Sequence, residues 1–142
     1  MNATTHRRLC GVLGLGLLTV VGGGLALVGA APFGTPTLAV QVVLVGAAGA
    51  LDVVAAFGNP VTARIDWFRL SGAANVALGL ALPVGILGWE GGAGGTLLLA
   101  VTAVGGLSLA AVGVDMWCCA GKHVYERPLD ADTDPATGSG DR

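Results

Sequence analysis

The sequence predicts an all-α integral membrane protein, a bundle of four transmembrane helices with both chain termini in the cytoplasm. Three observations support this fold class: the composition is strongly apolar, four runs are long enough to cross a bilayer, and the basic residues alternate with these runs. Of the 142 residues, 54% are hydrophobic and only 11% are charged, whereas soluble domains carry about 25% charged residues. Lipid can solvate apolar helix faces that water cannot, so this composition favours a membrane domain.

The distribution of the seven Lys and Arg residues predicts the orientation. Basic residues precede the first apolar run, separate the second run from the third, and follow the fourth, while the other two connections carry none. In chain order they are Arg7, Arg8, Arg64, Arg69, Lys122, Arg127 and Arg142. Because cytoplasmic loops are enriched in Lys and Arg, both termini are expected inside, at a cell membrane.

The first helix is expected at about residues 9–31, since this stretch has no charge and about 20 residues cross the hydrocarbon core. The second helix is expected at about 37–57. Pro32 and Pro36 lie between them, and two prolines so close together end one helix and begin the next. These two helices are therefore predicted to form a hairpin with an external turn.

The third helix is expected at about 67–89, with a kink in its outer half at Pro83. The stretch before it, 61–69, mixes charged and apolar residues and is interpreted as a short helix at the cytoplasmic surface. A glycine-rich external turn at 90–95 leads to the fourth helix, expected at about 96–120.

These helices divide the chain into three parts. A cytoplasmic amino terminus at 1–8 precedes the transmembrane domain at 9–121. The last part, 122–142, is predicted to be an acidic, disordered cytoplasmic tail because it is rich in Asp, Thr, Gly, Ser and Pro. One alternative stays open: the paired arginines before an apolar run also fit a twin-arginine export signal cleaved within residues 28–30, which would leave three helices.

A weak internal repeat is compatible with duplication of a two-helix hairpin. Residues 8–11 resemble 69–72, and residues 46–52 resemble 109–115. Both hairpins would start and end inside, so the repeat would be parallel. Sequence rich in Ala and Gly also matches itself by chance, and that alternative stays open.

Small residues predict where helices approach each other closely, because lipid provides no hydrophobic force between them. The clearest stripe has four-residue spacing in the third helix, and shorter stripes occur in the others. The members are Ala73, Ala77, Ala81 and Gly85; Gly22, Ala26 and Ala30; Gly46 and Ala50; and Gly106 and Ala110. A chain with 25 glycines can also produce such spacings by chance.

Three polar residues lie at a similar depth near the cytoplasmic ends of three predicted helices: Asp52, Asn75 and Asp115. An unpaired carboxylate there costs about 2–3 kcal/mol, so each Asp needs a partner or water. Candidate ion-pair partners are Arg64, Arg69 and Lys122. Two interpretations follow: a proton or cation site, or structural pairs that fix helix ends. The second is favoured because the depth is shallow and long basic side chains can reach it.

The three cysteines, Cys10, Cys118 and Cys119, map to the cytoplasmic ends of predicted helices. With His6 and His123 they offer thiolate and imidazole ligands that suit zinc or copper. However, adjacent cysteines do not match the usual C-x2-C spacing. The sequence therefore predicts no metal site and no cofactor, and the cysteines are interpreted as small apolar residues at helix ends.

No nucleotide-binding, metalloprotease or serine-hydrolase motif occurs in the sequence, and no basic patch suits nucleic acid. We therefore expect a protein without enzymatic activity, a structural or accessory component of a cellular or viral envelope that acts through helix packing. Its partners would be the lipid bilayer and a second copy or another membrane protein. The alternative is a small oligomeric transporter or proton or cation channel that uses Asp52 and Asp115.

Overall fold

The computed structural model describes residues 3–57, 60–87 and 92–123, and within these ranges the chain is helical, with no strand. This confirms the all-α prediction for the described residues. Four α-helices and one short 3-10 helix follow one another. They are α1 (Ala3–Val28), η1 (Ala31–Gly34), α2 (Pro36–Ala56), α3 (Trp67–Val84) and α4 (Gly92–Cys119).

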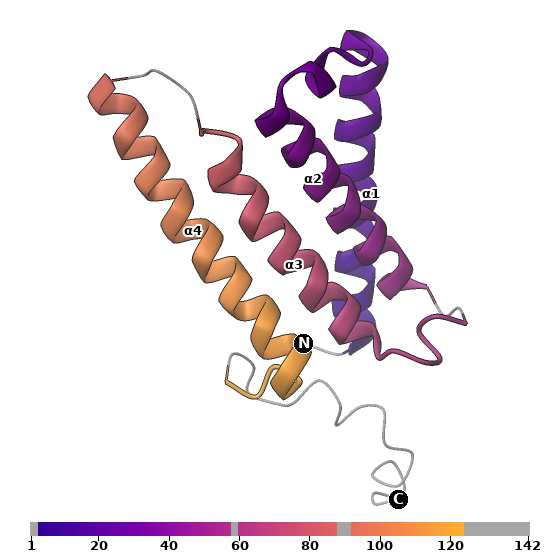
Figure 1. Ribbon diagram of the computed structural model, residues 1–142. Helices are drawn as coiled ribbons and strands as arrows, with labels where there is room; N and C mark the ends of the chain where they lie inside the picture. The colour runs from indigo at the N-terminus through magenta and orange to yellow at the C-terminus, as the bar shows by residue number, and fades with distance from the viewer. Residues whose placement is uncertain (1–2, 58–59, 88–91, 124–142) are drawn as a thin grey trace, which may run out of the picture.

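The four α-helices alternate in direction, so α1 begins, α2 meets α3, and α4 ends on the same side of the molecule (Figure 1). We call this side the basic end, because its segments carry Arg7, Arg8, Arg64, Arg69 and Lys122. The extensive contacts join α1 to α2, α2 to α3 and α3 to α4. The helices therefore form a row in which α2 and α3 are the inner members.

Helix α1 begins at Ala3, inside the segment that was expected to be a separate amino terminus. It ends at Val28, because Gly29 adopts a positive φ of 62° that L-residues rarely reach. The 3-10 helix η1 then turns the chain, and Pro36 occupies the first turn of α2. Proline suits that position because its missing N–H would have no partner there.

The connection between α2 and α3 contains no separate helix among its described residues, contrary to the expectation for 61–69. The described residues 60–64 form turns, in which the Arg64 and Ile65 N–H groups donate to the Val61 carbonyl at 3.0 and 2.8 Å. Helix α3 then begins at Trp67. Two antiparallel neighbours joined by so short a segment require tight turns, which leave no room for another helix.

Helix α3 is shorter than the predicted 67–89, because it ends at Val84, directly after Pro83. The N–H groups of Ile86 and Leu87 donate to carbonyls three residues earlier, so the helix tightens into turns. Helix α4 begins at Gly92, so part of the glycine-rich stretch predicted as a turn is helical. Gly92 itself has a positive φ of 57°, which lets the chain enter α4 sharply.

Three of the described helical segments are long and apolar enough to cross a membrane: Thr5–Val28, Pro36–Ala56 and Gly92–Cys119. Helix α3 is not among them. It has 18 residues and is about 27 Å long at 1.5 Å per residue. Its position between α2 and α4 covers much of its surface, and it holds more buried residues than any other described helix.

Glycines allow close helix crossings, and these glycines differ in part from the expected stripes. A Cβ on Gly14 of α1 would lie 2.6 Å from the Gly49 carbonyl oxygen of α2. In the other hairpin, Gly79 of α3 and Gly106 of α4 each occupy the space that a Cβ on the other would need. Gly106 and Gly22 were both expected at seams; Gly106 lies at a crossing, but Gly22 has open space beside it, so that prediction was wrong within the described structure. Helix rotation decides this, and spacing alone does not reveal it.

Gly72 and Gly113 form a second reciprocal contact between α3 and α4, seven residues from the first in each helix. Ala81 of the predicted alanine stripe is buried at 1% exposure. Near the basic end, Trp67 and Phe68 pack with Met116 and Ala55 in one apolar cluster. The Trp67 and Phe68 rings meet edge to face, with centroids 6.1 Å apart. This apolar cluster therefore joins α2, α3 and α4 near the basic end.

Candidate functional site

The buried carboxylate of Asp52 is bound by a side chain from another helix. Asp52, in the last turns of α2, is 2% exposed. The Ser71 hydroxyl of α3 donates a hydrogen bond of 2.9 Å to Asp52 Oδ1. Cys10 Sγ of α1 lies 3.3 Å from the same Ser71 oxygen. The three residues therefore link α1, α3 and α2 through one chain of polar contacts, which we call the Asp52–Ser71–Cys10 link.

Asp115 has a different environment, although the sequence suggested that it is the counterpart of Asp52. It lies near the end of α4, and its side chain is 11% exposed. His123 Nδ1 lies 2.7 Å from Asp115 Oδ1, and the His123 backbone N–H donates to Oδ2 at 3.3 Å. The nearest described partner of this carboxylate is thus a histidine on its own segment.

Asn75 joins neither carboxylate in a described contact. Its side-chain amide in α3 donates to the Met116 sulfur of α4 at 3.5 Å, and a thioether is a weak acceptor. The three polar residues that the sequence placed at one depth therefore have three separate sets of partners. The structure distributes them over the α2–α3 and α3–α4 contacts and the end of α4.

The basic residues also have other partners than those expected. Arg69 Nε lies 3.5 Å from Asp66 Oδ2, three residues earlier, and both side chains are about half exposed. Within the described ranges, no ion pair joins Asp52 or Asp115 to Arg64, Arg69 or Lys122. Exposed ion pairs of this kind stabilise a protein little. The Arg69–Asp66 pair also does not include Asp52, so the burial of the Asp52 carboxylate depends on other contacts.

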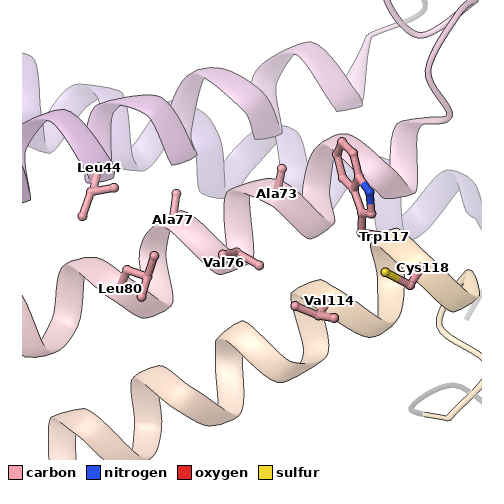
Figure 2. A pocket seen from close by; sticks show the side chains of 8 residues that line it. All are labelled: Leu44, Ala73, Val76, Ala77, Leu80, Val114, Trp117 and Cys118. Atoms are coloured by element: carbon pink, nitrogen blue, oxygen red, sulfur yellow. The ribbon is translucent and has the colours of Figure 1, made fainter.

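An apolar groove of about 400 Å³ runs along the contact between α3 and α4 and reaches α2 (Figure 2). It is lined by Leu44, Ala73, Val76, Ala77, Leu80, Val114, Trp117 and Cys118. Two members of the predicted alanine stripe, Ala73 and Ala77, therefore line this groove. Neither Asp52 nor Asp115 lines it, so its chemistry suits an apolar chain rather than an ion.

Gln41, in the first turns of α2, lies against the end of α3. A Cβ on Gly85 would meet the Gln41 side-chain amide, so Gly85 provides the space for it. This contact fills the region with a side chain. Among the described residues, no hydrogen bond or ion pair leads from Gln41 toward Asp52.

The cysteines separate into three environments. Cys10 belongs to the Asp52–Ser71–Cys10 link, Cys118 is exposed and lines the groove, and Cys119 is partly buried and does not line the groove. Cys119, Asp115 and His123 each place a potential ligand atom within 4.8 Å of the other two. His6 is not part of this group.

Sequence reasoning missed Ser71, because a single serine in an apolar helix usually bonds to its own backbone. Its position in the possible repeat was the one available signal: Ser71 corresponds to Cys10 when residues 69–72 are aligned with 8–11. These two residues touch in the structure. A contact between corresponding residues is compatible with duplication, but the different surroundings of Asp52 and Asp115 do not follow it. Duplication therefore stays a prediction.

Comparison with known proteins identifies a family without identifying an activity. A family model described as a family of unknown function (DUF7994) matches residues 5–130, a range that includes all but the first residues of α1 and the whole of α2, α3 and α4. No curated protein and no solved structure matches the chain.

Proposed function

Because the chain belongs to that family of unknown function, we propose its role from its own geometry: it is a multi-pass membrane protein that acts as a structural or accessory component through helix packing. In this proposal it catalyses no reaction, lies in the cell membrane and contacts a second copy or another membrane protein. The observation that carries the proposal is the Asp52–Ser71–Cys10 link, in which the buried carboxylate of Asp52 is held by a side chain of another helix and does not line the apolar groove found among the described residues.

The apolar outer surface supports the membrane environment. Large side chains on the long helices are widely exposed, among them Leu27 at 88%, Val12 at 72% and Leu107 at 69%. Soluble monomers rarely expose large contiguous apolar patches, because water solvates them poorly. Lipid tails are as apolar as leucine and solvate such faces without cost.

The alternating directions of the helices support the proposed orientation with both termini inside. Every basic residue in the described ranges belongs to the basic end, and cytoplasmic connections are the ones that carry Lys and Arg. Helix α3 would then cross the membrane as an inner helix, shorter than the others and shielded by α2 and α4. Its length of about 27 Å approaches the roughly 30 Å of the hydrocarbon core.

The outer faces of α1 and α4, at the two ends of the row, support association with another membrane helix. Gly16, Gly22 and Gly23 of α1 and Gly105 of α4 have no neighbour within 4 Å where a Cβ would stand. Inside the molecule, glycines such as Gly79 and Gly106 lie where helices cross so closely that an added Cβ would meet the backbone of the neighbouring helix. Small residues on an outer helix face allow a second helix to approach in the same way.

Flux measurements test this role against the transporter alternative. The full chain is reconstituted into vesicles loaded with a pH-sensitive dye, beside the variants Asp52→Asn and Asp115→Asn. We expect the wild-type vesicles to pass protons and monovalent cations no faster than empty vesicles. Flux above that level that either variant abolishes would overturn the structural role and favour the transporter.

The size of the particle in mild detergent tests association. We expect the protein extracted from its membrane to migrate with a mass well above one 13.9 kDa chain in its detergent micelle. Gly16→Leu on the outer face of α1 is expected to shift it toward the monomer without loss of helicity. A strictly monomeric wild-type particle would argue against an accessory role.

A further inference from the structure

Beyond helix packing, the end of α4 gathers three different metal-ligand side chains. Asp115 and Cys119 lie one helical turn apart, and His123 follows four residues later, after the helix has ended. One oxygen, one sulfur and one nitrogen from these residues all lie within 4.8 Å of one another. Carboxylate oxygen, thiolate sulfur and imidazole nitrogen are the three donor types found in zinc sites.

A reversal of the chain brings His123 into this group. Ala120 and Gly121 both have positive φ angles, 52° and 73°, so the chain leaves the helix axis and turns back. The Gly121 N–H donates to the Asp115 carbonyl, and the Lys122 N–H donates to the Cys119 carbonyl, each at 3.2 Å. Ala120 is the only non-glycine residue with positive φ in the described part of the chain. Non-glycine residues adopt this conformation only where the surroundings hold them there.

We propose that Asp115, Cys119 and His123 form a binding site for a divalent metal ion of zinc-like chemistry. The protein would provide three ligands, and water or a group from a partner would occupy the fourth position, as in open zinc sites. The ligands combine soft sulfur, intermediate nitrogen and hard oxygen. Such a set favours zinc over magnesium or calcium, which prefer oxygen ligands alone.

The three ligand atoms, which lie within 4.8 Å of one another, would reach zinc-binding distances through small side-chain movements. Zinc bonds of roughly 2.0–2.3 Å place neighbouring ligand atoms of a tetrahedron about 3.3–3.7 Å apart. The 2.7 Å contact between His123 Nδ1 and Asp115 Oδ1 is shorter than this, so metal entry would replace that hydrogen bond by two metal bonds. The His123 side chain is 76% exposed, so a small rotation would break its contact with Asp115 and meet few other groups.

The proton balance predicts how binding depends on pH. Cys119 binds the ion as a thiolate, so its thiol proton passes to solvent, and His123 binds through an unprotonated nitrogen. Lowering the pH therefore weakens binding, because protons compete for both ligands. The simpler role of the same residues, an Asp115–His123 hydrogen bond that closes the end of α4, involves no metal and no such release.

Metal binding by the purified full chain in detergent tests the site. The protein is washed with a mild chelator, kept reduced by a phosphine and titrated with Zn²⁺ against a coloured zinc indicator. Co²⁺ serves as a second probe, because its bond to a thiolate produces a charge-transfer absorption band. Cys119→Ser, His123→Ala and Asp115→Asn remove one ligand each. Cys118→Ser and His6→Ala are the matched controls, since they remove the same side chains outside the site.

We expect one Zn²⁺ per chain and a thiolate-to-cobalt band. Loss of a residue that merely supports a metal ligand weakens binding about 10–100-fold, so loss of a ligand itself is expected to weaken it at least as much. The two control variants are expected to bind like the wild type. The proposal is overturned if no stoichiometric metal binds, or if Cys118→Ser weakens binding as much as Cys119→Ser. Circular dichroism of each variant establishes that its helices are intact.

Discussion

Ser71 of α3 donates its hydroxyl to the buried carboxylate of Asp52 in α2 over 2.9 Å, and Cys10 of α1 lies against the same hydroxyl. A carboxylate removed from water requires such a donor, because desolvation without a partner is costly. The contact also ties helices from the two hairpins together. Among the described polar interactions, it best explains how the α1–α2 hairpin stays packed against the α3–α4 hairpin.

Replacing Ser71 by Ala should lower the free energy of unfolding. Interhelical hydrogen bonds in membrane proteins contribute roughly 0.5–2 kcal/mol, and here the loss leaves Asp52 without its donor. Unfolding of the reconstituted protein in mixed micelles with increasing denaturing detergent measures the change. Ser108→Ala is the matched control, since Ser108 bonds only to the Val104 carbonyl of its own helix and is exposed. Equal effects of the two variants would contradict the importance of the link.

Adjacent glycines in α4 provide a test of the helix crossing. Ala at position 106 would place its Cβ on the Gly79 carbonyl oxygen and near Pro83, neither of which can move independently of α3. We expect Gly106→Ala to destabilise the protein by about 1–3 kcal/mol through overpacking. Gly105→Ala should leave stability unchanged or raise it by up to about 1 kcal/mol, because Ala favours a helix and position 105 is open.

The same detergent titration, followed by circular dichroism, measures both glycine variants. A loss of stability at position 105 comparable to that at 106 would mean that the crossing does not limit packing. A helix separation, detected by spin labels on α3 and α4, should accompany the Gly106→Ala change alone.

Membrane topology gives a third prediction, because four crossings place both termini on one side, whereas three crossings without α3 would place them on opposite sides. Small reporter tags in η1 and after residue 123 should be accessible from opposite sides of intact vesicles or cells. A tag in the 60–66 connection should share the side of the carboxyl-terminal tag. Tags that place the start of α1 and the end of α4 on opposite sides would show that α3 does not cross.

Metal addition should stabilise the wild-type fold if the proposed site binds zinc. A ligand that binds the native state alone adds about 2.7 kcal/mol at a concentration of 100 times its Kd. Zn²⁺ at that excess is therefore expected to raise the unfolding midpoint, and a chelator should restore the original value. The same addition should leave Cys119→Ser unchanged. Stabilisation of both proteins would assign the effect to a different site.

Much of the secondary structure could be predicted from the sequence. Pro36 fixed the start of α2 and the Trp67 region the start of α3, both close to the observed bounds. The end of α3 and the start of α4 were predicted less accurately, since α3 ends early, after Pro83, and α4 begins early, at Gly92. Glycine and proline act on the backbone itself, so helix bounds close to them can be predicted from the local sequence. Hydropathy alone does not distinguish an apolar turn from an apolar helix.

The candidate site was harder to predict. The sequence predicts that the three polar residues Asp52, Asn75 and Asp115 lie at the same depth in the membrane. Their described partners differ, however: they are Ser71, Met116 and His123, respectively. Which side chains meet depends on how far each helix is rotated about its axis. That rotation is set by contacts such as Gly14 with Gly49, between residues far apart in the chain.

The sequence by itself determined that the chain is helical, strongly apolar and basic at alternate connections, because hydropathy, proline and charge act through composition over short stretches. Only the tertiary structure decided that the helices stand in a row, that Ser71 binds Asp52, and that His123 turns back onto Asp115 and Cys119. The physical reason is that helix rotation and register depend on close backbone crossings, and these involve pairs of residues that no local pattern connects.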